Sequence, residues 1–300
     1  MPNAVANAAA NAAANAAASP AAGATGWRAH LSLHYTRSGD RTVALDRHSG
    51  PLRVLQRLYP EGPGICHHVL VHPPGGLVGG DVLELDARLG ESTHAVLSTP
   101  GATRFYRSEG LVALQSAHVS LAPGARLEWW PMESIAYRGC IAQNRLELSL
   151  AAGAEAMGWD LLALGLPASG DPFNAGQYLQ HLEVQGAWLE RGLIDAANTR
   201  LMHSPLGLAG YRVLATMWFT AGSALALARR DALLDAARAE CADDPLRAQA
   251  GATAAHPRVV VLRVLADHVE PAMALLRRVR AAWRVRAWQL QSNPPRLWQT

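Results

Sequence analysis

Strict alternation of apolar and polar residues is the feature of this sequence that most constrains its fold. Residues 29–35 alternate Ala, Leu, Leu and Tyr with His, Ser and His, and the same period of two recurs at residues 83–89, 126–129 and 146–150. A strand points successive side chains to opposite faces, so this pattern buries one face and leaves the other in water. Turn-forming Gly, Pro and Asp residues separate the runs. Many short strands at such spacing predict a mainly β fold.

Two stretches in the C-terminal half follow a helical pattern instead. Residues 223–241 are rich in Ala, Leu, Arg and acidic residues and end shortly before Pro245, which stops a helix. Residues 269–290 carry an apolar stripe, and most of their five arginines lie off it. These arginines form either a solvated face or a docking surface for an acidic partner. Between the two helices, the β-branched run over residues 259–264 predicts a strand.

Composition and charge exclude several classes of protein. Half of the 300 residues are hydrophobic and 17% are charged, which is typical of a folded chain with a sizeable core. All the basic residues are arginines and the net charge is +3, too small for a dedicated nucleic-acid binder. Cys66, Cys140 and Cys241 form no CxxC pair, so we expect neither a zinc ribbon nor a disulfide framework, and a cytoplasmic setting.

The first residues and the longest apolar run bear on domain organisation. Residues 1–25 repeat Asn every four positions in an Ala background and lack the basic and apolar regions of a signal peptide. We expect residues 1–25 to be a disordered tail and residues 26–300 a single β domain. The apolar run at residues 213–228 contains Thr and Ser and is too short to cross a membrane. It is predicted to be buried core, with no membrane partner.

The segment from His72 to Asp81, with the sequence HPPGGLVGGD, is the most unusual in the chain. Its four glycines could suggest a phosphate cradle. A Walker loop, however, ends in Lys-Ser/Thr, and a dinucleotide loop opens a helix, whereas an alternating strand follows here. Pro73 and Pro74 cannot donate to a ladder of strands. The segment is therefore predicted to be a rigid turn between strands that faces solvent or lines a cavity.

Clustered histidines and arginines offer two further candidate sites. His67, His68 and His72 lie close to Cys66, and imidazole suits zinc, copper, iron and nickel; the alternative is a structural role. In residues 98–108, arginines surround a Phe-Tyr pair after a Pro-Gly turn. They could grip an anion, or they could be ordinary surface arginines of an edge strand.

Three acidic residues keep an enzymatic alternative open. Glu133 follows an apolar Trp-Trp pair, so its carboxylate is expected to be partly buried and to need a partner. Asp160 and Asp171 each lie beside a turn. Paired carboxylates perform glycoside hydrolysis, so a β-solenoid polysaccharide hydrolase is an alternative, although the secretion signal that usually accompanies one is missing. An Arg-rich nucleic-acid module, with steep salt dependence, is a third possibility.

Five motifs in one order resemble a known family. They occupy residues 72–81, 99–108, 131–135, 158–170 and 295–300. In this order they are similar to the motifs of the UreD (UreH) family of urease accessory proteins, over about residues 27 to 300. The family usually has Gln where Met132 stands, an acid where Arg138 stands and Arg where Leu166 stands. We therefore expect the polar contacts around the third and fourth motifs to differ in this chain.

The resemblance implies a fold, a function and a set of partners. Members of the family are non-enzymatic and adopt a mainly β, solenoid-like fold with a pair of helices. They bind the urease apoprotein subunits and a helical accessory protein, UreF, which recruits the nickel-carrying GTPase UreG. The assembled complex delivers Ni²⁺ to urease. The chain would thus be a metallochaperone scaffold with no permanently bound cofactor, through which nickel passes transiently.

A nickel conduit would hold the ion loosely, because tight capture would stop delivery. Nickel accepts imidazole, carboxylate and water. The candidate lining consists of one imidazole and three carboxylates: His72, Asp81, Glu133 and Asp160.

Two other groups of motif residues have structural or partner roles in this hypothesis. Close backbone approach and irregular turns would be provided by four glycines: Gly75, Gly76, Gly79 and Gly80. Since cations repel Ni²⁺, Arg104, Tyr106 and Arg107 are expected to organise a strand or a partner surface.

Overall fold

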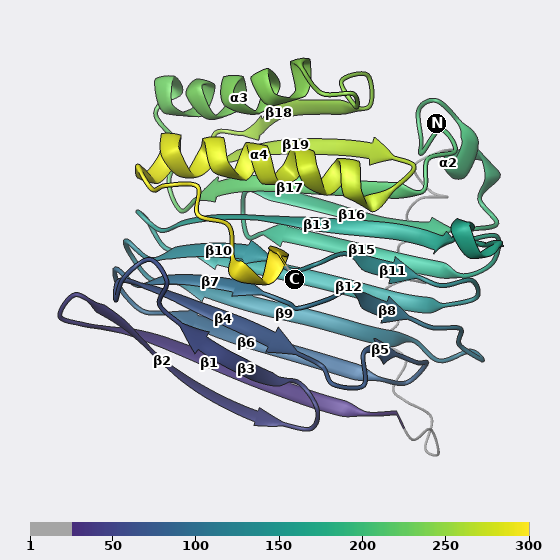
Figure 1. The fold of residues 1–300 in the computed structure, drawn as a ribbon, viewed down its shortest axis with the longest axis horizontal. Helices are drawn as coiled ribbons and strands as arrows, with labels where there is room; N and C mark the ends of the chain where they lie inside the picture. Colours follow the sequence, from purple (N-terminus) through teal and green to yellow (C-terminus); the bar gives the residue numbers. More distant parts are fainter. Residues whose placement is uncertain (1–25, 300) are drawn as a thin grey trace.

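Two β-sheets wound from one coil of chain form the body of the protein (Figure 1). The computed structural model describes residues 26–299. In spatial order, the seven-stranded sheet consists of β16 (Trp188–Asp195), β15 (Gln177–Val184), β12 (Ile141–Leu150), β9 (Ala113–Leu121), β6 (Val82–Leu89), β1 (Arg28–Ser38) and β2 (Arg41–Ser49). Its five inner strands are parallel, and β2 and β16 pair antiparallel at the two edges.

The second sheet has twelve strands. Its main path is β18 (Ala250–His256), β19 (Val259–Ala266), β17 (Val213–Ala221), β13 (Glu155–Leu166), β10 (Arg126–Trp130), β7 (His94–Ser98), β4 (Ile65–Val71) and β3 (Arg53–Leu58). Four short strands pair beside this path: β5 (Gly76–Leu77), β8 (Thr103–Phe105), β11 (Ser134–Ala136) and β14 (Asp171–Pro172).

Successive turns of the coil place one strand in each sheet, which confirms the expected solenoid-like arrangement. The strand pairs are β1 and β4, β6 and β7, β9 and β10, and β12 and β13. Parallel register stacks equivalent residues of neighbouring turns into rows. One buried row crosses five strands through Leu31, Leu85, Ala117, Leu146 and Leu182. The period of two in the sequence arises because every second side chain of a strand belongs to such an interior row. Burying each Leu side chain contributes about 2 kcal/mol to the free energy of unfolding.

The helices follow the predicted order, with one addition. The stretch predicted to be helical at residues 223–241 overlaps α3 (Leu227–Ala242), which ends one residue later, and the stretch at residues 269–290 contains α4 (Val269–Trp288). The predicted strand between them lies within β19. A further helix, α2 (Thr199–His203), begins after Asn198, whose side chain accepts a hydrogen bond from the Leu201 amide. Its five residues are too few to show a helical period. Two 3₁₀ turns cover Pro167–Ser169 and Arg296–Gln299.

The structure confirms the first part of the predicted core run and does not test the predicted tail. Residues 213–221 form β17, whose side chains are almost all buried, so the first part of that run is core as expected. Residues 1–25, predicted to be a disordered tail, lie outside the described residues. Within residues 26–299 no helix has the length and apolar character needed to cross a membrane.

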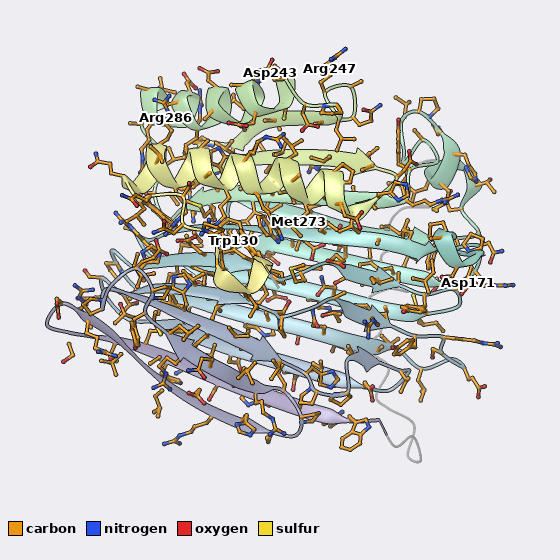
Figure 2. All side chains as sticks on the ribbon, viewed as in Figure 1. Trp130, Asp171, Asp243, Arg247, Met273 and Arg286 are labelled. Carbon is orange, nitrogen blue, oxygen red and sulfur yellow. The ribbon has the colours of Figure 1, made fainter. Side chains whose placement is uncertain are left out.

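Helices α3 and α4 lie beside the strands at one end of the twelve-stranded sheet (Figure 1). Trp130 of β10 is buried in one apolar cluster with Met273 and Trp283 of α4. Arg286 and Arg247 project outward at the helical end of the molecule (Figure 2). The expectation that the α4 arginines lie mostly off the buried face is wrong for Arg280 and Arg284, which are 1% and 0% exposed.

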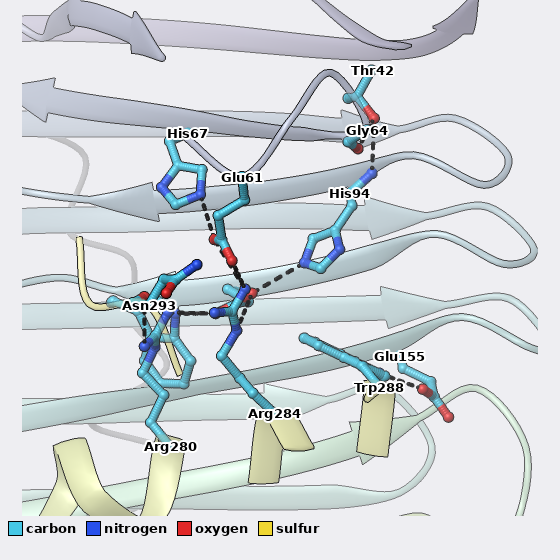
Figure 3. Close-up of polar contacts among 12 residues, drawn as sticks. Thr42, Glu61, Gly64, His67, His94, Glu155, Arg280, Arg284, Trp288 and Asn293 are labelled. Atoms are coloured by element: carbon cyan, nitrogen blue, oxygen red, sulfur yellow. Dashed lines mark hydrogen bonds and ion pairs between the residues drawn. The ribbon is translucent and has the colours of Figure 1, made fainter. Parts of the chain in front are cut away.

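The two buried arginines belong to a network of charged groups that joins α4 to the sheet (Figure 3). Glu128 of β10 is fully buried and lies within hydrogen-bond distance of Arg280 Nη2 (3.2 Å), Arg284 Nε (3.1 Å) and His94 Nε2 (3.1 Å). Arg284 also donates to Glu61 at 2.8 Å. His67 in turn contacts Glu61 at 2.9 Å. These side chains are called the carboxylate network: Glu61, His67, His94, Glu128, Arg280 and Arg284.

The carboxylate network keeps Glu128 ionised despite its burial. Burial alone would raise the pKa of Glu128, but the His94 hydrogen bond and the charges of Arg280 and Arg284 together hold this pKa well below its usual range. Burial lowers the pKa of His94, in spite of the Glu128 carboxylate beside it. Two carboxylates therefore balance two guanidinium groups inside the protein.

Replacing Glu128 with Ala should destabilise the protein strongly, because Arg280 and Arg284 would lose their buried counter-charge. A loss of about 3–5 kcal/mol in the free energy of unfolding is expected, measured by urea denaturation. Since the pKa of Glu128 is depressed, this difference should be fully present above the ordinary carboxyl pKa of 4.5 and shrink as the pH falls further.

The matched control is Asp231→Ala, which removes an acid from an exposed ion pair with Arg230. Its cost should stay below about 1 kcal/mol. Equal unfolding midpoints for Glu128→Ala and Asp231→Ala would contradict a central role for the network.

Candidate functional site

A cavity of about 350 Å³ lies between the two sheets, next to the glycine-rich segment. Its walls are mostly apolar and come from both sheets, with Leu70, Leu85 and Leu146 among them. A small number of polar side chains break this lining. They include His72, Arg104, Gln115, Asn144 and Asp160. An apolar cavity with a few convergent polar groups is the ordinary form of a binding site.

Asp160 is the acid at the centre of the polar lining. It lies on β13, is 7% exposed, and accepts hydrogen bonds from Asn144 Nδ2 at 2.7 Å and Gln180 Nε2 at 2.6 Å. Asn144 in turn accepts from Gln115 Nε2 at 3.2 Å. The two sheets therefore meet here through a chain of polar side chains instead of apolar packing.

Gln115, Asn144 and Gln180 form one row of the seven-stranded sheet. Asn144 pairs in register with Gln115 on one side and with Gln180 on the other. No residue of this row was predicted from the sequence as part of a site. The signal is nevertheless present, because each residue is polar at an inward position of its strand, where the neighbours two residues away are mostly apolar.

The environment of Asp160 differs from that of Glu128 in its charges. Burial raises the pKa of Asp160 to about 6 and outweighs the hydrogen bonds from Gln180 and Asn144, which lower it, while the nearby Glu190 carboxylate adds to the rise. No guanidinium takes part in the shift. A buried acid that changes charge near neutral pH in a cavity is a candidate functional group.

His72 is the second predicted residue in the cavity lining. Its Nε2 atom is buried and has no hydrogen-bond partner among the described residues. Burial lowers the pKa of His72, although the Asp81 charge opposes this effect. The imidazole is therefore neutral at physiological pH, which is the form that ligates a metal.

The other two predicted carboxylates lie outside the cavity lining. Asp81 is buried and accepts hydrogen bonds from the backbone N–H groups of Trp27 (2.7 Å) and Val78 (2.9 Å), so it anchors the turn that ends the glycine-rich segment. Glu133 is partly buried, as expected, and its Oε2 atom has no hydrogen-bond partner among the described residues. Its charge acts on Arg277 of α4.

The glycines of residues 72–81 allow the backbone of this segment to lie close against residues 106–108. A Cβ atom at Gly76 would lie 2.3 Å from the Tyr106 ring, and one at Gly79 would lie 2.2 Å from Ser108 Oγ. Gly75 and Gly80 take positive φ angles of 77° and 95°. The segment leads into strand β6 and opens no helix, as expected of a turn.

The remaining motif residues lie around this turn. Arg104 and Arg107 are exposed, and Arg104 lines the cavity mouth beside Gly75. The ring of Tyr106 lies 4.8 Å from that of Tyr137. Met132, one of the expected departures, also lines the cavity.

The histidines near Cys66 do not gather into a metal site among the described residues. His68 contacts the Tyr35 hydroxyl through Nδ1 at 2.7 Å, and His67 contacts Glu61 in the carboxylate network. These two imidazoles are therefore structural, and only His72 reaches the cavity.

Comparisons with known proteins agree on one family. A family model described as UreD urease accessory protein matches residues 27–299. The urease accessory protein UreD of Leptothrix cholodnii is 60% identical over 276 residues, which cover 91% of this chain and 99% of the relative. The proteins of the same name from Verminephrobacter eiseniae and Variovorax paradoxus are 60% and 57% identical, with the same coverage.

Replacing Asp160 with Asn should stabilise the protein at neutral pH. The pKa of Asp160 is raised, so the folded state binds its proton more tightly than the unfolded chain does. Ionisation then costs stability as the pH rises from about 4 to about 7. The Asn variant avoids this cost, up to about 3 kcal/mol, while the Gln180 amide can turn to present its oxygen.

Thermal unfolding at about pH 5 and about pH 8 measures the effect. The advantage of Asp160→Asn over wild type should grow with pH, and the exposed Asp267→Asn control should show no such trend. A variant that is less stable than wild type at the higher pH would contradict the raised pKa.

Proposed function

The chain belongs to the UreD family of urease accessory proteins, and on this basis we propose that it is a scaffold and nickel conduit in urease maturation. An accessory role in urease maturation follows from the family itself. The polysaccharide-hydrolase alternative is thereby excluded. The finer proposal is that Ni²⁺ is the cargo, and that it passes through the cavity between the two sheets.

The observation that carries this proposal is that Asp160 and His72 line the same, mostly apolar cavity. A neutral imidazole and a carboxylate are ligands that nickel accepts. Asp160 is held by amides and no cation, so it presents an unneutralised charge to an entering dication. Two such groups in a cavity of this size hold an ion loosely and let it leave, as a conduit requires.

Asp81 and Glu133 support the route in different ways. Asp81 fixes the turn that carries His72 through its two backbone hydrogen bonds, so we assign it a positioning role. The buried, unpartnered oxygen of Glu133 follows cavity residues Pro131 and Met132. Its negative charge lowers the barrier for a dication near the cavity.

We also infer the partners and the setting. The chain would act in the cytoplasm as a non-enzymatic chaperone that binds the urease subunits and UreF, and through UreF the GTPase UreG. The sequence supports this division of labour, because it contains no lysine and so cannot supply the lysine of a P-loop. Nucleotide hydrolysis would therefore belong to a partner.

Asp160→Asn should reduce nickel delivery without weakening the complex. The substitution removes the charge from the cavity and keeps the shape of the side chain, and it should not destabilise the fold. When the variant is expressed with urease and its other accessory proteins, nickel per urease active site should fall about tenfold, which corresponds to about 1.4 kcal/mol. Co-purified partners should remain at wild-type levels.

Asp267→Asn is the matched control, because it makes the same chemical change at an exposed position. It should leave both nickel content and partner recovery unchanged. Normal nickel loading with Asp160→Asn, or loss only in proportion to lost complex, would overturn the conduit role of Asp160.

The purified chain should show no saturable binding of GTP in a calorimetric titration. The physical reason is the missing glycine-rich loop with its Lys-Ser/Thr end. Purified UreG, titrated under the same conditions, serves as the positive control. Saturable micromolar binding by the chain alone would contradict the scaffold assignment.

A further inference from the structure

A row of alternating imidazoles and carboxylates crosses the outer face of the seven-stranded sheet. It is called the imidazole–carboxylate row and consists of His30, Asp86, His118, Glu147, His181 and Glu183. The residues lie on β1, β6, β9, β12 and β15, which are neighbours in the sheet (Figure 1). The row faces away from the cavity, because the inward residues of the same strands form the interior rows.

Strand register explains why these side chains meet. Asp86 pairs with His118, His118 pairs with Glu147, and Glu147 pairs with Glu183 across parallel neighbours. His181 lies two residues before Glu183 and therefore points to the same face. The parallel coil thus gathers side chains that are far apart in the sequence.

The tightest part of the row is the group Glu147, His181 and Glu183. His181 Nε2 lies 3.0 Å from Glu183 Oε2 and 3.8 Å from Glu147 Oε1. One ligand atom from each of the three residues lies within 4.8 Å of the other two, and all three residues are partly buried. His118 Nε2 is 3.6 Å from Glu147 Oε2, so a second imidazole borders the group.

The two neighbouring carboxylates of this group favour the binding of a cation. Glu147 and Glu183 lie directly opposite each other on adjacent strands, and like charges in that position destabilise a sheet. Arg145 and Arg191 pair with His181 in the adjacent row. Arg145 donates to Gln143 at 2.8 Å, and among the described residues it forms no ion pair with either glutamate. The two arginines reduce the negative potential at the group and limit its affinity.

We propose that Glu147, His181 and Glu183 form a surface site for a divalent transition-metal ion, with His118 as a further ligand. Imidazole with carboxylate suits zinc, nickel, cobalt and copper, whereas Ca²⁺ and Mg²⁺ prefer all-oxygen sites. The open face leaves remaining positions to water. This site is separate from the proposed conduit, since it lies on the opposite face of the sheet from the cavity.

Calorimetric titration of the untagged full chain with zinc chloride tests the site. Residues 1–25 contain no His, Cys, Asp or Glu, so the tail adds no competing ligand side chains. Wild type should bind zinc and give no saturable heat with calcium chloride. The double variant His181→Gln/Glu183→Gln should bind zinc about tenfold more weakly or not at all, while retaining the wild-type melting temperature.

Two controls separate this site from other histidines and from the conduit. His34→Gln changes an exposed imidazole on the same sheet face and should bind zinc as wild type does. In an Asp160→Asn background, which weakens any binding in the cavity, the site double variant should cause the same loss of zinc binding as in wild type. If the double variant unfolds, Glu147→Gln alone provides the same test. Undiminished zinc binding in a folded site variant, equal loss in His34→Gln, or calcium binding as tight as zinc would overturn the proposal.

Discussion

The buried carboxylate of Glu128 is the constraint on which the packing of the C-terminal helices depends. A fully buried anion on a central strand must find counter-charge inside the protein, and both Arg280 and Arg284 of α4 supply it. Any other placement of α4 would leave buried charges without partners. Because Arg284 also holds Glu61, one helix joins β10 to the loop between β3 and β4. Burying these charges costs about as much as their attraction returns, so the network as a whole adds little net stability, whereas the loss of one partner is costly.

The contrast between Glu128 and Asp160 separates a structural acid from a candidate functional one. Both are buried carboxylates between layers of the same fold. Glu128 is neutralised by guanidinium groups, which hold its pKa well below the usual range. Asp160 is held only by amides, and its pKa is raised to about 6. Burial alone therefore does not mark a site; an uncompensated charge beside a cavity does.

The local residue pattern predicted the strands and helices of this fold better than it predicted the contacts of its buried charged and polar groups. Alternation at residues 29–35 and 146–150 identified strands because one face of each is packed, and the solenoid-like winding was expected only from the family resemblance. The inward turn of Arg280 and Arg284 could not be foreseen, because it depends on Glu128, more than 150 residues earlier in the chain (a separation of 152 for Arg280). Similarly, His72 and Asp160 were predicted as candidates, but their shared cavity depends on how the sheets stack. Their assigned role in nickel transfer remains a prediction.

The long sequence separations in the carboxylate network have a consequence for synthesis on the ribosome. Turns of the coil can stack as they emerge, because each pairs with the turn made just before it. Glu61 and Glu128, however, meet their guanidinium partners only after α4 has been translated, 223 residues after Glu61. Until then the nascent chain carries two carboxylates on a surface destined for burial. Closure of this layer therefore waits until α4 has been synthesised, and the partly wound chain is most open to non-native association in the interval before it.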